Sequence, residues 1–228
     1  MKKLILGLLT ALGIAYSGAN SYATTLADNI GIGGGISVSN FTTDRGLATR
    51  EDSLGYSFSL TAPLADGDLS IIAGLADTDN DTDGSFSVAY SKPVEILGQK
   101  LQAKASFSGV DSVFGDREEV ALGLTCGLGL IDASAAVWHE LENEWFGVEL
   151  GASRSFVTPI NDLLVTPFVT VNLADEYTAL EAGLKAGYPI SDQLSVTAKL
   201  SYNNNDFDNS AFKVEDEWIV GAGLSFDF

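Results

Sequence analysis

The chain has little cysteine, histidine and positive charge, and each of these shortages excludes a class of structure or partner. Its one cysteine, Cys126, has no partner for a disulfide, so the fold must rest on backbone hydrogen bonds and packing. One histidine and one cysteine cannot make the cluster of soft ligands that a transition metal needs. Only 12 lysines and arginines oppose 31 aspartates and glutamates, and a net charge of −19 argues against nucleic acid as a partner.

Long hydrophobic runs are also missing, except at the N-terminus. There, Lys2 and Lys3 precede an apolar run from Leu4 to Tyr16, and small or polar residues follow up to Ala23. This is the pattern of a secretory signal peptide, and the run is too short to cross a bilayer as a helix. We therefore expect residues 1–23 to be a signal peptide. Removing its two lysines takes the net charge from −19 to −21.

Hydrophobic residues nevertheless make up 46% of the chain, and they are separated from polar ones by alternation. In the final stretch, WIVGAGLSFDF, every second residue is apolar, which predicts a strand with one apolar face. The ending resembles the carboxy-terminal signature of bacterial outer-membrane β-barrels, an alternating strand that closes on an aromatic residue. That resemblance implies a signal for the barrel assembly machinery, formed by Trp218, Leu224, Phe226 and Phe228.

The same two-residue period recurs along the chain and predicts twelve strands. Most are close to the roughly 9 to 11 residues that a tilted transmembrane strand needs. We expect an all-β protein with one domain, residues 24–228, folded as a closed antiparallel transmembrane β-barrel in the outer membrane; ten or fourteen strands are the alternatives. The predicted strands are 30–40, 53–63, 68–76, 84–93, 100–110, 119–131, 132–142, 145–157, 163–173, 178–189, 193–203 and 217–228.

The second face of these strands decides between a membrane barrel and a soluble one. It carries mainly Gly, Ser, Thr and Ala, whereas a water-exposed surface would be rich in Lys, Glu and Arg. We therefore assign the apolar face to lipid and the small residues to the lumen. The charged residues of lumen parity are Lys104, Glu149, Glu181, Lys185 and Lys199.

Three positions do not follow the simple pattern. Pro167 falls inside a predicted strand, where it removes a ladder hydrogen bond and predicts a bulge. Arg154 has the parity of lipid-facing residues, so we expect it near the membrane interface at the far end of its strand. The stretch ASAAVWHE has no clear parity, and its register stays open.

Acidic residues concentrate in the connections after odd-numbered strands, which face outward if both termini are periplasmic. Six such stretches hold 21 of the 31 acidic residues against four cations, a rim of −17. This excess of acidic residues has two possible explanations: a negative electrostatic potential that serves a function, or the ordinary polarity of exposed loops. The four cations are Arg45, Arg50, Arg117 and Lys213.

One outer stretch, DTDNDTDG, looks like the start of a calcium loop. Asp79, Asp81 and Asp83 are spaced like the first ligands of an EF-hand, but the closing glutamate is replaced by Tyr90. We expect either a hydrophilic hairpin tip or a weak Ca²⁺ site, and no other cofactor. The tip is favoured because alternating Asp with Thr or Asn is common in turns.

Two functions are compatible with these features. Outer-membrane barrel hydrolases and acyltransferases pair a histidine with serine or aspartate, whereas His139 here lies beside Glu140 and Glu142, so we expect no enzyme. Small twelve-stranded porins for acidic oligosaccharides resemble this chain in length and hairpin rhythm, although those families line the lumen with arginine. A passive channel for small solutes, with a preference for cations, is the first hypothesis. A structural barrel with a blocked lumen is the alternative, with acidic loops that hold divalent cations against lipopolysaccharide phosphates.

Overall fold

The computed structural model describes residues 31–44, 47–77, 82–111, 117–159, 162–206, 208–209, 212–213 and 217–227. The predicted signal peptide, Asp79, Asp81 and Phe228 lie outside these ranges, and the side chain of Asp83 is not described. No helix in the described ranges is long and apolar enough to cross a membrane. The architecture is built from strands.

Twelve long strands form the barrel wall, which confirms the predicted number. In chain order, they are β1 (Gly31–Asp44), β2 (Leu47–Leu64), β3 (Gly67–Asp77), β4 (Thr82–Ile96), β5 (Gln99–Asp111), β6 (Arg117–Gly127), β7 (Asp132–Glu140), β8 (Phe146–Ser153), β10 (Leu164–Ala174), β11 (Thr178–Ser191), β12 (Leu194–Asn205) and β15 (Glu217–Asp227). Three two-residue strands complete the set: β9 (Phe156–Val157), β13 (Asp208–Asn209) and β14 (Phe212–Lys213).

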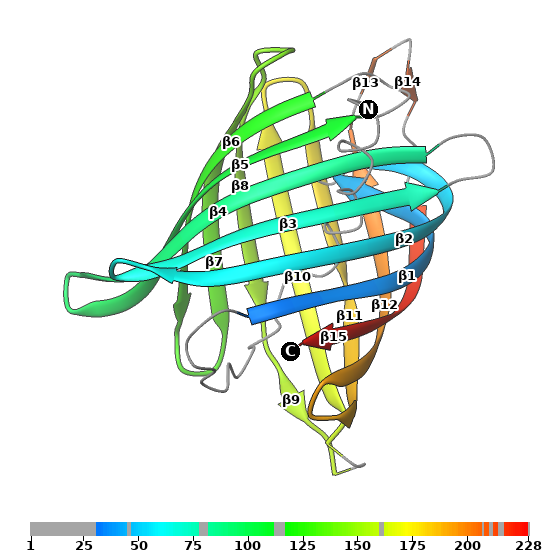
Figure 1. Cartoon of the computed structure of the whole chain (residues 1–228). Coiled ribbons are helices and arrows are strands. Elements are labelled where there is room, and N and C mark those ends of the chain that lie inside the picture. Colours follow the sequence, from blue (N-terminus) through cyan, green and yellow to red (C-terminus); the bar gives the residue numbers. More distant parts are fainter. Residues whose placement is uncertain are drawn as a thin grey trace, which may run out of the picture.

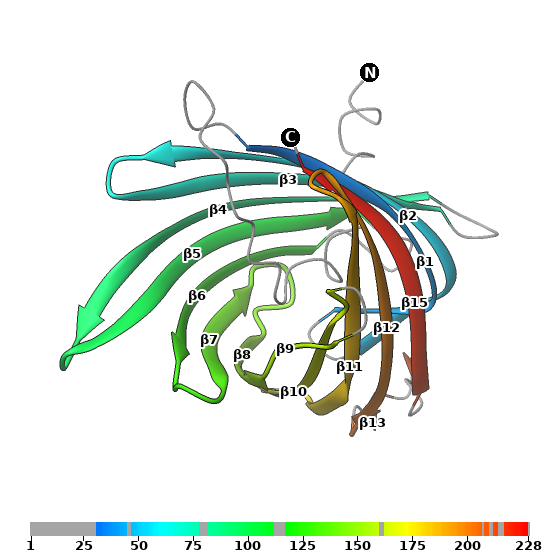
Figure 2. The same ribbon diagram turned by 90° about the horizontal axis from the view of Figure 1, so that it is seen from below.

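The sheet closes on itself, and all its pairs are antiparallel. Each wall strand pairs with the next in the chain, β15 returns to pair with β1, and β10 joins β8 to β11. In side view, β1 to β5 run at a steep angle to β10 to β12, and the view from below shows the strands curving round an interior (Figures 1 and 2). Closure leaves no free sheet edge in the wall, as a hydrocarbon environment requires.

The alternation of the sequence places apolar side chains outside. On β6, Val120, Leu122 and Leu124 are exposed on the outward face, while Ala121 and Gly123 face inward. The same holds on β1, where Ile36 and Val38 point outward. In water, so large an apolar surface would drive aggregation, so its natural contact is lipid.

The two ends of the barrel differ. At one end, here called the turn end, Leu64↔Gly67 and Ile96↔Gln99 pair across two-residue turns. The start of β1 and the end of β15 also lie there, because Gly33 pairs with Asp227. At the opposite end, here called the loop end, most connections are longer than two residues. Short periplasmic turns and longer outer loops are typical of outer-membrane barrels, so the turn end corresponds to the predicted periplasmic side.

Some predicted boundaries were wrong. β1 and β2 extend to Asp44 and back from Leu47, so most of the predicted outer stretch 42–52 is strand. The strand predicted over 119–131 ends at Gly127, because Leu128 to Ile131 form the turn into β7. Alternation cannot mark such ends, since apolar residues continue through that turn.

Pro167 interrupts the wall without making the predicted bulge. Ser153 pairs with Phe168 and Phe156 with Val165, so the register is the same on both sides of the break. The Arg154 amide donates to the Pro167 carbonyl oxygen at 3.2 Å, whereas proline has no N–H to donate back. The missing hydrogen bond therefore splits one predicted strand, 145–157, into β8 and β9. Arg154 is exposed in this break, beyond β8, as expected.

The open register of β7 is resolved by its pairing with β8. Trp138 lies opposite Gly147 and faces inward, where it forms a buried cluster with Tyr177 and Ala179. His139 has the outward parity, since it pairs with the exposed residue Val120. A tryptophan inside the lumen is the reason why this stretch has no clear polar and apolar side.

Three of the four predicted assembly residues, Trp218, Leu224 and Phe226, occupy the outward face of β15. Trp218 and Leu224 are exposed to the lipid side, and the Trp218 ring lies 5.3 Å from that of Tyr202. Phe226 covers Gly34 of β1, where an added Cβ would come within 2.8 Å of its ring. The last strand thus seals the barrel against the first one, but recognition of these residues by assembly machinery stays a prediction.

Candidate functional site

The interior face of β11 and β12 carries a compact group of charges. Lys185 lies directly opposite Lys199, and Glu181 lies on the same face of β11, four residues before Lys185. Lys199 Nζ is 2.5 Å from Glu181 Oε1, and the two side chains are only 9% and 12% exposed. The Ser201 hydroxyl donates a second hydrogen bond to Glu181 Oε1 at 2.6 Å. This ion pair offsets the repulsion between lysines that face each other across a strand pair.

An aromatic ring from the next strand completes this group. Phe168 on β10 has the Lys185 ammonium 4.5 Å and the Lys199 ammonium 5.6 Å from its ring centroid, within the range of cation–π attraction. Phe168 was missed in the sequence, although it has the same parity as the interior residues Thr166 and Thr170. The interior cluster, as we use the term, is Phe168, Glu181, Lys185, Lys199 and Ser201.

The two remaining predicted lumen residues lie elsewhere on the interior face. Glu149 on β8 pairs with the buried residue Asn172 of β10. Lys104 on β5 faces inward beside Gly123. Six steps round the ring separate β5 from β12 in either direction, so Lys104 stands on the wall opposite Lys199. All five predicted residues therefore face the interior, and the fold brings three of them together.

The wall between these charges is lined with small residues. On β1 and β15, Gly35 pairs with Ser225 and Ser37 with Gly223, both on the interior face. The Ser195 and Ser225 hydroxyls lie 2.7 Å apart across β12 and β15. Small polar side chains leave room and offer hydrogen bonds to water or solutes, which suits passage rather than tight binding.

The loop end of the interior is filled differently. Glu140, at the end of β7, is fully buried, and Arg117 Nη2 lies 3.1 Å from its Oε2 atom. This contact is an ion pair without hydrogen-bond alignment, since Oε2 has no hydrogen-bond partner. The Asn143 side-chain amide donates to Oε1 at 2.5 Å. From the sequence, Arg117 and Glu140 were predicted only to be charged residues of the outer rim, and their ion pair was not foreseen.

Carboxylates also shape two connections at the loop end. Asp175 Oδ2 accepts a hydrogen bond from the Phe146 amide at 3.1 Å, and Asp206 Oδ1 accepts one from the Thr178 amide. By contrast, Glu142, Glu144 and Glu176 are exposed on these connections. Part of the acidic rim is therefore structural, and part presents free charge to solvent.

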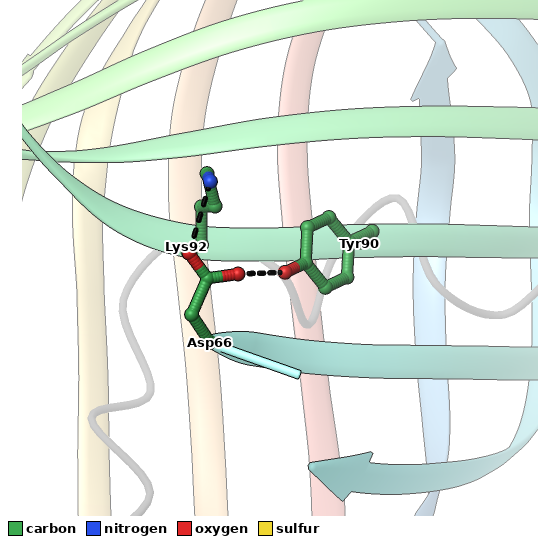
Figure 3. A network of polar contacts seen from close by, with 3 residues as sticks. All are labelled: Asp66, Tyr90 and Lys92. Carbon is green, nitrogen blue, oxygen red and sulfur yellow. Dashed lines mark hydrogen bonds and ion pairs between the residues drawn. The ribbon is translucent and has the colours of Figure 1, made fainter. Parts of the chain in front are cut away.

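A polar network marks the outer surface near the turn end (Figure 3). Asp66, in the β2–β3 turn, accepts hydrogen bonds from the Tyr90 hydroxyl at 2.8 Å and the Lys92 ammonium at 3.0 Å, both on β4. The Tyr90 hydrogen bond, followed by that of Lys92, lowers the pKa of Asp66 below its ordinary value of 3.8. Tyrosine and lysine at this level are typical of the interface between lipid and water.

The structure adds little support for the two other candidate sites, His139 and the proposed calcium loop. His139 Nδ1 lies 3.1 Å from the Trp145 carbonyl oxygen, on the outward face. In the ranges that the structure describes, no group of three or more His, Cys, Asp or Glu side chains could hold a metal ion. The proposed calcium ligands fall mostly outside those ranges, so the Ca²⁺ site stays a prediction.

Together, the closed wall, the apolar outward surface and the polar interior define an outer-membrane β-barrel. The predicted location in the cell outer membrane agrees with this class. Solved structures of the class resemble the chain over most of its length. The KdgM porin has a TM-score of 0.56 at 9% identity, covering 87% of this chain and 99% of its own.

Two further structures are similar to the same degree. The NanC porin has a TM-score of 0.54 at 10% identity and covers 86% of this chain and 98% of its own. An outer-membrane channel from Pseudomonas putida F1 has a TM-score of 0.53 at 11% identity and covers 92% and 99%. At such identities the likeness concerns the fold. No known protein family and no curated protein matches the sequence.

Proposed function

We propose that the protein is a passive, non-enzymatic channel for small solutes, with a preference for cations. The observation that carries this proposal is the interior face, where small polar residues separate a few fixed charges. Such a wall does not bring the side chains of a catalytic site together, and it does not enclose a single ligand. Similar folds belong to porins and an outer-membrane channel, which supports the proposal at the level of architecture.

The preference for cations rests on the loop end. Exposed carboxylates there raise the local concentration of cations and repel anions. The interior cluster contributes less net charge, because Glu181 neutralises one of its two lysines. Selectivity that comes from exposed charge must weaken with salt, since the screening length falls from about 10 Å at 0.1 M to about 3 Å at 1 M.

Reversal potentials across a potassium chloride gradient in planar bilayers test this. We expect cation selectivity at low salt that diminishes at high salt. Neutralising the exposed residues Glu142, Glu144 and Glu176 to glutamine should reduce it without abolishing conductance. Asp175 and Asp206 are left intact, because their carboxylates hold backbone amides.

A matched control removes three exposed carboxylates from the turn end, through Glu95→Gln, Asp162→Asn and Asp192→Asn. With the loop end facing the dilute solution, this variant should keep most of the selectivity. Anion selectivity of the unaltered protein would contradict the rim argument.

A second candidate, a structural barrel with a blocked lumen, is favoured by one specific observation. Several inward-facing side chains at the loop end and on β12 are fully buried, among them Trp138, Ser201 and Asn203. A correctly folded barrel without measurable conductance would favour this candidate over the channel.

A further inference from the structure

We propose that permeation through this barrel is limited by an aromatic constriction at the loop end, formed by Trp138, Trp145 and Tyr177. The interior cluster of charges, further down β11 and β12, is then not the narrowest part. The inference rests on the proposed channel function, because it names the residues that set the channel's size limit.

Trp138 is the centre of this constriction. It projects inward from β7 near the loop end, and only 1% of its surface is exposed. Its indole packs against Gly147 of β8, where an added Cβ would overlap the six-membered ring. Glycine at this position therefore admits the largest side chain of the sequence to the lumen wall.

Two short connections bring the other two rings into the cluster around Trp138. The Trp145 and Tyr177 rings lie 6.2 Å apart at an interplanar angle of 67°, an edge-to-face arrangement. Tyr177 is buried, and Trp145 packs against the same cluster. The aromatic groups thus come from β7, from the β7–β8 connection and from the β10–β11 connection.

Backbone hydrogen bonds fix these connections. The Glu140 amide donates to the Trp145 carbonyl oxygen at 2.8 Å, and the Ala174 amide to that of Tyr177 at 2.9 Å. The two connections also join each other, since the Asp175 amide donates to the Phe146 carbonyl oxygen at 3.1 Å. A rigid constriction is expected from such a frame, rather than a loop that swings in and out.

The ion pair of Arg117 and Glu140 anchors the cluster to β6. Glu140 ends the strand that carries Trp138, and its carboxylate contacts both Arg117 and Asn143. Moving the end of β7 would separate these charges in a buried position, which is costly. By contrast, inward-facing Ser57 and Lys104 are only half-buried, so solvent reaches the middle of the interior.

The test compares single-channel conductance and the uptake of sugars of graded size into proteoliposomes. Trp138→Ala and Tyr177→Ala should raise the conductance and admit larger sugars than the unaltered protein does. The matched control is Tyr202→Ala, which removes an aromatic ring from the lipid face at the same end. It should leave both measurements unchanged. Trp138→Leu serves the same purpose if the alanine variant shows no folded band on unheated gels.

The outcomes separate this inference from the proposed function. If the unaltered protein conducts and Trp138→Ala does not differ from it, the constriction lies elsewhere and the inference fails alone. If the unaltered protein does not conduct and Trp138→Ala does, the constriction is confirmed, but the proposal that the unaltered protein is an open channel fails. Silence of both proteins would overturn both proposals.

Fluorescence gives a readout that is independent of conductance, because the chain has three tryptophans. With Trp145 and Trp218 changed to phenylalanine, the remaining Trp138 should resist quenching by brominated lipid and by iodide. With Trp138 and Trp145 changed instead, Trp218 should be quenched by brominated lipid. Quenching of Trp138 by the lipid would place it outside the lumen and overturn the inference.

Discussion

Two ion pairs of nearly equal length but opposite burial make a direct test of the structure. Arg117 and Glu140 are 3.1 Å apart, with side-chain exposures of 20% and 0%, whereas Lys92 and Asp66 are 3.0 Å apart, with exposures of 40% and 68%. Length alone predicts similar effects when the cation is removed. Burial predicts very different ones, because an unpaired charge costs most where water cannot reach it.

For Arg117→Gln, we expect a loss of stability near the lower end of the range for broken buried pairs, about 3 kcal/mol. The lower end applies because Arg117 is partly exposed and Asn143 still donates to Glu140. A loss of about 3 kcal/mol reduces the equilibrium constant for folding by more than about a hundredfold. Lys92→Gln should leave the stability unchanged within error, because exposed pairs contribute little.

The charges around Glu140 add an asymmetry to this experiment. Glu119 lies directly opposite Glu140 on the interior face of β6 and β7, so the two carboxylates repel each other. Glu140→Gln relieves that repulsion and leaves Arg117 able to reach water. It should therefore cost less than Arg117→Gln, and the double variant should recover much of the loss.

Urea unfolding of the protein in lipid vesicles measures these differences, with tryptophan fluorescence and unheated gel mobility as probes of the folded barrel. A double-mutant cycle isolates the energy of the pair. The reasoning would be refuted by an Arg117→Gln loss as small as that of Lys92→Gln. It would equally be refuted if the double variant were no more stable than Arg117→Gln.

Three further predictions concern the barrel's end, its loops and its outer surface. Deleting Phe228 should impair assembly into the outer membrane while leaving secretion intact, which fractionation and heat-modifiability measure; full-length protein in the soluble periplasmic fraction would contradict the assignment. Asp79, Asp81 and Asp83 should bind Ca²⁺ only in the millimolar range about which looser extracellular sites operate, because the closing carboxylate is missing; calorimetry against the triple Asp→Asn variant checks this, and micromolar binding would contradict it. The pKa of Asp66 should lie below 3.8 in a carbon-13 titration, so that its hydrogen bonds to Tyr90 and Lys92 weaken only as the pH falls through that lowered value; Tyr90→Phe should raise it, and an unchanged pKa would count against the network.

The number of strands, and the face of every wall strand except β7, were predicted from the sequence itself. A strand side chain points to one face or the other with a period of two, so alternating residues such as those of β15 reveal the lipid side without knowledge of any neighbour. The same parity placed Lys104, Glu149, Glu181, Lys185 and Lys199 inside. Face and approximate extent are local properties, and local patterns predict them well.

Which interior residues meet was decided only by the tertiary structure, because pairing depends on register and closure. Alternation could not show that Lys185 lies opposite Lys199, nor that Pro167 keeps the register on both sides of its gap. It also gave no direction for Trp138, since a tryptophan on a barrel strand suits the lipid interface as well as the lumen. Gly147 on the neighbouring strand admits its indole to the lumen, and a contact between two strands cannot be read from either one alone.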